Sequence, residues 1–552
     1  GLGMLSAVER CVDEIARTRD QRIDLSRVPL DDDRVWSAIQ RAETTGVFQI
    51  ESRAQMQMLP RTQPRDLDDL TVQVALVRPG PIQGGAVHPY LERRERLRRD
   101  PSFRVPYEHP SLEPILRDTL GTIVFQEQVI QVAMELGGFS AGEAEGLRRA
   151  MSRKRSEEAI VAHRERFIAG ARERGASAEV AERVFEQIRG FSGFGFPKAH
   201  AVAFGLLAYQ STWLRVHYGP ELLCSLLNEQ PMGFYPPDAL VHEAQRRGIE
   251  VQPPDVNASG VECCVERSRS TGDAGAGVDG SGLVVRIGLG YITGLRVEEA
   301  TAMVEERGRG GPYADLADLA SRSGTGAEGL ERVAWAGACK RLGGRDDLRR
   351  REDLWRLGVA GGARRGAQAQ LSLPLSIPAA PSLRELEPWQ RLVADYASTG
   401  IAIAEHPMSL LRPGLDERMS SSADLEQTSD GGRVQVAGMV VARQRPATAK
   451  GVVFMLLEDE LGTINVVVPP PVYERHRLVV RTASFAAVSG RLERRERVVN
   501  VVAMSLRSLI TPDQPHAEVR HIEPSIERET GRAEADLAAV MPAAHSFGRR
   551  GR

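Results

Sequence analysis

Apolar positions recur at helical spacing through residues 1–230 with few breaks, which predicts a mainly α-helical region. Asp31, Asp32 and Asp33 precede an apolar stretch that begins at Val35, and acidic side chains in that place complement the dipole of a helix. We therefore expect these three residues to cap a helix. Further helices are expected over residues 127–135, 157–174 and 201–218.

The spacing of apolar residues along the chain changes after residue 430. Short Val-rich runs then follow one another, separated by polar and Gly-containing breaks. The five expected strands are Val434–Val441, Val452–Leu457, Ile464–Val468, Ala486–Gly490 and Val498–Val502. Five short strands in so short a stretch are typical of a small barrel of the OB type.

Composition divides the chain into five parts and predicts a multidomain protein. A helix-rich part (1–260) is followed by short helices (261–358), a linker with short helices (359–430), the barrel (431–510) and a polar tail expected to be disordered (511–552). The run 267–283 is rich in Gly and Ser, which is typical of a hairpin tip or an insertion. The fold class expected is mainly α, ending in a small all-β barrel.

Charge and cysteine content exclude several classes of protein. The net charge is −2, so nucleic-acid binding must be argued from local charge. None of the five cysteines forms a C-x-x-C pair, so we expect no zinc site and no disulfide framework, and a cytoplasmic location. No apolar run approaches 18 residues, which predicts no membrane span. The start, Gly1–Met4, is neither a signal peptide nor a usual translation start, so we expect a piece of a longer protein.

The first candidate binding element is the basic run Leu147–Arg155. Five of its nine side chains are cationic, namely Arg148, Arg149, Arg153, Lys154 and Arg155. The guanidinium group of Arg can donate two hydrogen bonds to phosphate oxygens, and the ammonium group of Lys adds a positive charge. The run could therefore hold a triphosphate. On charge alone, a solvated helix end is the stronger alternative.

The second candidate is Phe191–His200, which reads Phe-Ser-Gly-Phe-Gly-Phe-Pro-Lys-Ala-His. Its two glycines permit a tight backbone, and Lys198 and His200 open the next expected helix. A helix N-terminus with these side chains favours an anion. The alternative is a hydrophobic turn with a capping His, and the residues alone do not separate the two.

Taken in order, these runs and three others resemble the α subunit of bacterial DNA polymerase III, the C family of DNA polymerases. The three others are Gly46–Ser52, Val77–Pro81 and Val124–Val129. The resemblance extends from Gly1 to about Leu509. The stretch Leu227–Tyr235 resembles the error-prone, damage-induced branch of the family.

The resemblance implies what each part does. Residues 1–260 correspond to the fingers, residues 261–358 to a tandem helix-hairpin-helix domain and residues 431–510 to an OB domain. It implies primer–template DNA and deoxynucleoside triphosphates as partners, and mutagenesis accessory proteins as further candidates. The expected nucleotide contacts are Arg148, Arg149, Lys154, Lys198, His200 and Arg78.

The expected hairpin can be checked against its residues. Ile292–Ala300 fits the hairpin pattern with Thr293 in place of Pro, Gly294 retained, and Arg296 in place of the second Gly. Such hairpins present backbone N–H groups to DNA phosphates, so we expect these three residues to contact DNA. A second, weaker copy is expected at Ala334–Ala338. An ordinary helix–turn–helix connection is the alternative for both.

The linker contains Gln-Leu-Ser-Leu-Pro-Leu, residues 370–375, which resembles the short motif by which bacterial polymerases bind the sliding clamp. The expected clamp contacts are Gln370, Leu371, Leu373 and Leu375, held as an extended peptide. The alternative is a linker whose leucines pack on a neighbouring helix.

The family's chemistry depends on Mg²⁺ held by palm aspartates, two of them in an Asp-x-Asp motif on a strand. The acids here, Asp31–Asp33 and Asp66 with Asp68 and Asp69, belong to helical patterns. We therefore expect no catalytic residue and no metal ligand in this chain, and expect the complete enzyme to hold Mg²⁺ through other residues. A non-catalytic adaptor that binds DNA and the clamp is the alternative function.

Overall fold

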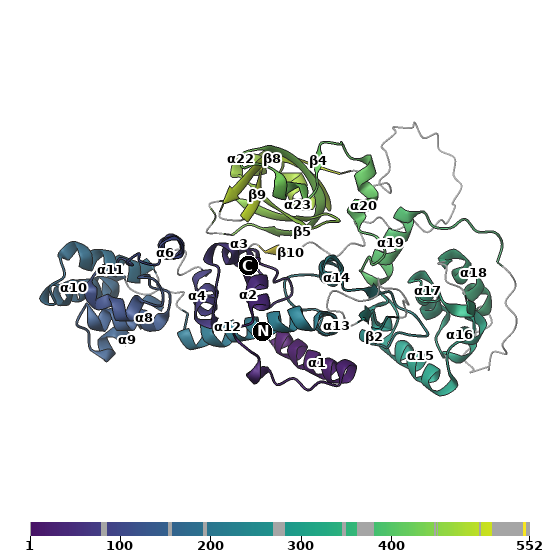
Figure 1. Ribbon diagram of the computed structural model, residues 1–552. Helices are drawn as coiled ribbons and strands as arrows, with labels where there is room; N and C mark the ends of the chain where they lie inside the picture. The colour runs from purple at the N-terminus through teal and green to yellow at the C-terminus, as the bar shows by residue number, and fades with distance from the viewer. Residues whose placement is uncertain are drawn as a thin grey trace. The chain divides into compact units, whose positions relative to one another are not determined.

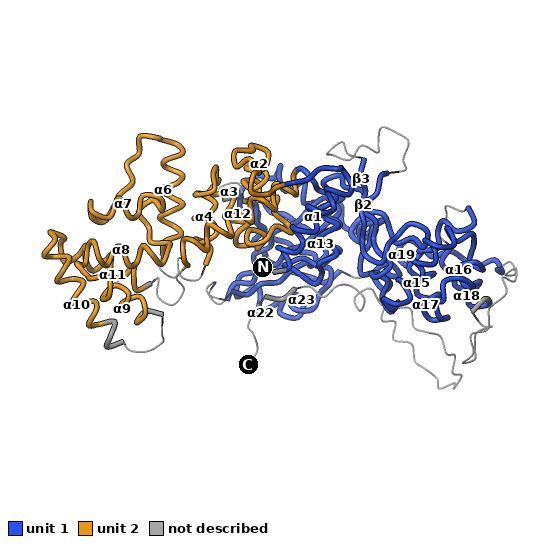
Figure 2. The backbone as a smooth tube through the Cα atoms, turned by 90° about the horizontal axis from the view of Figure 1, so that it is seen from below, with its two compact units in different colours: residues 1–23, 217–494, 499–552 blue, residues 24–216, 495–498 orange. Residues whose placement is uncertain are grey.

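The computed structural model describes residues 2–78, 85–152, 157–190, 196–268, 282–344, 349–361, 380–446, 449, 451–495, 498–509 and 545–547. These residues form two compact units, which Figure 2 shows in different colours. Unit 2 comprises residues 24–216 with 495–498. Unit 1 comprises residues 1–23, 217–494 and 499–552.

Unit 2 is built from helices (Figure 1). They are α2 (Asp33–Gln40), α3 (Arg53–Thr62), α4 (Leu67–Leu76), α6 (Val87–Arg99), α7 (Glu113–Leu116), α8 (Gln126–Glu135), α9 (Ala141–Ser152), α10 (Glu157–Glu173), α11 (Ala178–Gly190) and α12 (Lys198–His217). The four helices expected from apolar spacing are all present, as α2, α8, α10 and α12.

Polar side chains begin several of these helices. Asp32 accepts hydrogen bonds from the N–H groups of Arg34 and Val35, so the expected acidic cap of α2 is confirmed. Asp66 caps α4 by accepting from Asp69 N at 2.8 Å. Each cap satisfies N–H groups that the first turn of a helix leaves without an intrahelical partner.

Two apolar cores stabilise unit 2. One lies around α2, α4 and α12, where the rings of Trp36 and Tyr209 are 4.9 Å apart and buried. The other joins α8 to α11, with the rings of Phe167 and Phe185 5.6 Å apart. Each helix contributes one apolar face to a core, as its spacing in the sequence predicted.

Unit 1 combines helices with a small three-stranded sheet. Its helices are α1 (Leu2–Arg19), α13 (Gly219–Asn228), α14 (Pro237–Arg246), α15 (Val297–Gly310), α16 (Leu316–Arg322), α17 (Ala327–Trp335), α18 (Arg350–Gly361), α19 (Pro388–Thr399), α20 (Pro407–Leu411) and α21 (Asp424–Gln427). The sheet has the order β1 (Val251–Gln252), β3 (Leu283–Arg286), β2 (Cys264–Arg267). Strands β2 and β3 pair antiparallel. Residues 269–281 between them, most of the expected hairpin tip, lie outside the described residues.

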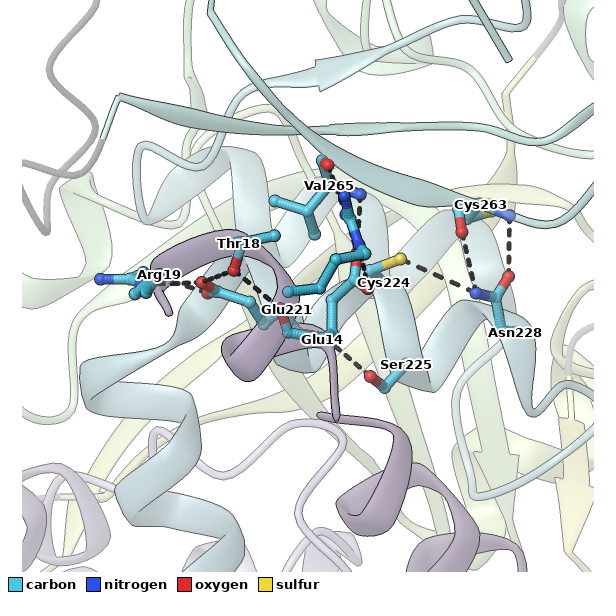
Figure 3. Close-up of polar contacts among 10 residues, drawn as sticks. Glu14, Thr18, Arg19, Glu221, Cys224, Ser225, Asn228, Cys263 and Val265 are labelled. Atoms are coloured by element: carbon cyan, nitrogen blue, oxygen red, sulfur yellow. Dashed lines mark hydrogen bonds and ion pairs between the residues drawn. The ribbon is translucent and has the colours of Figure 1, made fainter. Parts of the chain in front are cut away.

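A buried ion pair joins α1 to α13 (Figure 3). Glu221 is fully buried on α13 and accepts hydrogen bonds from Arg19 (Nη2 to Oε2, 3.0 Å) and from the Thr18 hydroxyl at 3.1 Å. Further along, Glu14 accepts from Val265 N at 3.0 Å, which attaches α1 to strand β2. The first helix is therefore held to segments more than 200 residues away in the sequence.

The C-terminal strands close into a barrel. The strands are β5 (Arg433–Gln444), β6 (Val453–Glu458), β7 (Thr463–Val468), β8 (Phe485–Arg495) and β9 (Val498–Ser508). They are bonded in the order β5-β6-β7-β9-β8, and β5 also pairs with β8, which closes the ring. Two short helices, α22 (Pro470–Arg475) and α23 (Arg477–Thr482), lie between β7 and β8 in the chain. Short strands β4 (Met419–Ser420) and β10 (His545–Phe547) each pair parallel with β5.

The predicted fold class is confirmed: a mainly α protein with a helix-hairpin-helix part and a five-stranded barrel of the OB type. All five expected strands are present, and β8 and β9 extend beyond the predicted bounds. The tail was expected to be disordered, yet its residues 545–547 form strand β10. These residues pair through their backbone with strand β5, more than 100 residues earlier in the chain. The polar composition of the tail does not predict such a pairing.

Candidate nucleotide and nucleic-acid interface

Arg78 lies against an aromatic ring in unit 2. It follows α4, and its guanidinium carbon is 3.7 Å from the centroid of the Phe196 ring, just ahead of α12. The Phe196 carbonyl in turn accepts a hydrogen bond from Gln126 N at 3.1 Å. The Nε of Arg78 is buried and has no hydrogen-bond partner among the described residues, and burial lowers the pKa of Arg78. A partly desolvated guanidinium with unused donor capacity suits an anionic ligand.

His200 lies beside the same ring, so the structure brings Arg78 and His200 together, whereas Lys198 Nζ lies 5.9 Å from the centroid of the Phe125 ring. His200 packs edge-on between Phe196 and Phe204, with centroid distances of 4.9 and 4.1 Å. Lys198 Nζ pairs with Asp118 at 2.9 Å. At the start of α12, where the sequence predicted a bound anion, the Lys198 N–H donates to the Glu127 carboxylate at 3.0 Å.

Arg148 and Arg149 make different contacts. Both lie on α9 and donate to the Glu145 carboxylate, with distances of 2.7–2.9 Å. These two guanidinium groups lower the pKa of Glu145 to about 2. The Arg149 side chain is 71% exposed, against 31% for Arg148. The third member of the predicted set, Lys154, lies outside the described residues.

The predicted hairpin ends at the N-terminus of α15. Gly294 has φ +83°, a left-handed conformation that favours glycine, and it is exposed with Thr293. Arg296 is the N-cap residue, 73% exposed, and pairs with Glu299 at 2.9 Å. The Thr293 N–H donates to the Ser398 carbonyl at 2.7 Å, so this amide already has a hydrogen-bond partner within unit 1. In the second candidate, Gly337 has φ +74° just after α17 ends.

Three of the described acidic residues near the start of the chain have partners within the polypeptide. Asp32 and Asp66 are occupied as helix caps, and Asp69 is paired with Arg94. In the described ranges, one group of three or more His, Cys, Asp or Glu side chains is close enough to share a metal ion, and it contains a single carboxylate: His242, His406 and Glu458. A polymerase pair of Mg²⁺ ions needs several carboxylates, so these residues do not fit it.

The expected clamp residues 370–375 lie outside the described part of the chain. Sequence reasoning named Arg78 and His200 but missed Phe196, the ring that both of them contact. It also missed the group His242, His406 and Glu458, whose members are too far apart in the sequence to form a motif. None of the helices that the structure describes is both long and apolar enough to cross a membrane.

Comparison with known proteins assigns the three parts. The finger domain of the bacterial DNA polymerase III α subunit matches residues 4–175, a helix-hairpin-helix motif matches residues 248–349, and an OB-fold nucleic-acid-binding domain matches residues 434–509. A finger domain, a helix-hairpin-helix motif and an OB-fold domain therefore follow one another along the chain in this order. The chain belongs to the family of bacterial DNA polymerase III α subunits, the C family of DNA polymerases.

Individual relatives carry the name "Error-prone DNA polymerase". The protein of Anaeromyxobacter sp. (strain K) is 42% identical over 533 residues, which cover 94% of this chain and 45% of the relative. That of Mycolicibacterium paratuberculosis is 43% identical over 508 residues, covering 92% and 44%. That of Burkholderia pseudomallei is 43% identical over 515 residues, covering 92% and 47%. The expected resemblance and its error-prone branch are confirmed, and the chain spans about half the length of these curated relatives.

Proposed function

We propose that this chain is the nucleotide- and DNA-gripping portion of an error-prone DNA polymerase that copies damaged template DNA. The observation that carries the proposal is the 42% identity over 94% of the chain to proteins with that name. The complete enzyme would use Mg²⁺ held by carboxylates other than those described here. Within the complete enzyme, this chain would supply the cationic side chains that contact the triphosphate and the surfaces that bind duplex and single-stranded DNA.

For the nucleotide, we propose contacts from Arg148, Arg149 and Lys154, with Arg78, Lys198 and His200 in the same pocket. In a complete polymerase that contains this chain, Arg149→Ala is expected to lower kcat/KM for the nucleotide about ten- to hundredfold. A charge-assisted contact to phosphate contributes roughly 1.5–3 kcal/mol. DNA affinity should change little.

The matched control for that variant is Arg164→Ala, which removes a guanidinium paired with Glu182 on neighbouring helices of unit 2. Single-turnover incorporation at varied nucleotide concentration measures both. If Arg149→Ala and Arg164→Ala leave kcat/KM equally unchanged, the basic run is a solvated helix end.

For DNA, we propose phosphate contacts from Gly294 and Arg296 at the start of α15 and from the barrel. The chain is expected to bind primer–template DNA with little sequence preference. Its affinity should fall by about 0.9 log units per log unit of salt for each phosphate neutralised. Arg296→Ala is expected to reduce that slope by about one such unit.

Arg309→Ala provides the control, because Arg309 lies at the other end of α15 with the same 73% exposure and its own Glu partner. Fluorescence anisotropy from about 50 to 200 mM salt gives the slopes, a range over which phosphate contacts weaken strongly. An affinity that does not depend on salt, or equal slopes for both variants, would contradict the hairpin assignment.

For the sliding clamp, we propose that Gln370, Leu371, Leu373 and Leu375 bind as an extended peptide. Replacing Gln370, Leu371 and Leu373 with Ala is expected to weaken clamp binding at least about tenfold, because each removed side chain loses its own pocket or hydrogen bond. Gln368→Ala in the same linker is the control. Surface plasmon resonance on immobilised clamp measures both, and equal binding would make the motif a plain linker.

A further inference from the structure

Two histidines and a glutamate from distant parts of unit 1 meet inside it. His242 lies on α14, His406 directly precedes α20, and Glu458 ends strand β6. One nitrogen or oxygen from each of the three lies within 4.8 Å of the others. The His242 and Glu458 side chains are 4% and 1% exposed, while His406 is partly exposed. This group is separate from every residue assigned above to nucleotide, DNA or clamp.

Each of the three residues has a buried atom that lacks a hydrogen-bond partner among the described residues. These atoms are Nδ1 of His242, Nε2 of His406 and Oε2 of Glu458. Buried polar groups are almost always hydrogen-bonded, and leaving one without a partner is costly. Three such atoms in one place, all of them good metal ligands, indicate that something absent from the polypeptide completes the site.

We propose that His242, His406 and Glu458 bind one divalent transition-metal ion of the zinc type, which ties α14 and the start of α20 to strand β6 of the barrel. Two imidazole nitrogens and a carboxylate oxygen form a ligand set that suits such an ion, with a water completing a tetrahedral shell. The proposal is independent of the proposed polymerase function.

Neighbouring groups hold two of the ligands in the required state. His242 Nε2 lies 3.1 Å from the Ala402 carbonyl and 3.4 Å from Asp238, so its proton belongs on Nε2 and Nδ1 is left to bind. Such a carboxylate–histidine–metal arrangement is usual around bound zinc. Glu458 uses Oε1 to pair with Arg246 at 2.6 Å, which leaves Oε2 for the ion.

The third ligand rearranges on binding. His406 Nδ1 accepts a hydrogen bond from Met408 N at 3.1 Å, so the neutral ring carries its proton on Nε2. A metal ion bound at Nε2 requires that proton to move to Nδ1, and this breaks the hydrogen bond from Met408 N. Zinc bonds of about 2.0–2.2 Å place ligand atoms about 3.4 Å apart.

Two carboxylates lie close to the His242 ring. Asp238, on the same helix, is 3.4 Å from His242 Nε2, and Glu458 Oε1 is 3.7 Å from His242 Nδ1. This negative charge around the ring favours a bound cation.

The test is Zn²⁺ binding by the full 552-residue chain after treatment with a chelator, measured by competition with a chromophoric chelator. We expect one equivalent of tightly bound Zn²⁺ and a higher melting temperature. His406→Gln should weaken binding at least a hundredfold. His406 is the partly exposed member of the group, so circular dichroism of this variant should match the original.

Two matched controls are available in or near the barrel. His476→Gln and Glu460→Gln alter a His and a Glu outside the group and should leave binding unchanged, whereas Glu458→Gln should not. X-ray absorption of the zinc-loaded original chain should show nitrogen and oxygen ligands without sulfur. The proposal is overturned by less than about 0.1 equivalent of bound zinc, by zinc that His406→Gln does not release, or by sulfur ligands.

Discussion

The purified 552-residue chain is expected to bind primer–template DNA and to leave the primer unextended with Mg²⁺ and all four deoxynucleotides. Phosphoryl transfer depends almost wholly on metal positioning and charge stabilisation. Among the described residues, Asp32 and Asp66 cap α2 and α4, and Asp69 pairs with Arg94. A triphosphate held by arginines alone has no metal pair against the primer hydroxyl, so extension should be lower by many orders of magnitude.

Primer extension on a denaturing gel measures this directly, with a mock purification to account for host polymerase. Adding the part of an error-prone relative that this chain does not match should restore extension if the proposed function is right. Extension by the chain alone above the mock level would show that it carries metal-binding carboxylates that we have not identified.

Glu221→Gln is expected to destabilise the junction of α1 and α13 by about 3 kcal/mol, because removing one partner of a buried ion pair leaves the other charge uncompensated. Glu221 is fully buried and the Arg19 side chain is 18% exposed. Amide hydrogen exchange in these two helices should therefore become about a hundredfold faster. Mass spectrometry of exchanging peptides measures the change helix by helix.

Glu92→Gln is the matched control, since Glu92 pairs with Arg96 on α6 and both side chains are more than half exposed. Exposed pairs of this kind contribute about 0–1 kcal/mol, so exchange should change only slightly. If Glu221→Gln behaves like Glu92→Gln, the ion pair does not hold α1 in place. DNA binding at the hairpin should be unaffected by either variant.

Local chemistry determined most of the secondary structure. The cap of α2 could be predicted because Asp32 accepts from N–H groups two and three residues away, and Asp66 begins α4 in a similar way. The barrel strands could be predicted because they are short Val-rich runs separated by polar and Gly-containing breaks. The resemblance of ordered motifs, rather than periodicity, indicated the polymerase family.

The tertiary structure alone decided which side chains meet. Arg78 and Phe196 are far apart in the sequence, and no spacing rule predicts that one packs on the other at 3.7 Å. The same is true of Glu127, which takes the place at the start of α12 where the sequence predicted a ligand anion. Apolar periodicity reports which face of an element is buried, and it carries no information on which distant element covers that face.

The group His242, His406 and Glu458 is a further case in which the tertiary structure, and not the sequence, decides which side chains meet. The sequence predicted no metal ligands, because its cysteines form no C-x-x-C pair and its clustered aspartates belong to helical patterns. The ligands come together only when α14, the segment before α20 and strand β6 pack into one unit. The sequence by itself determined the helices, the strands and the family, because these depend on neighbours along the chain. The folded unit decided the polar sites, because each is built from residues that only long-range packing brings within a few ångströms.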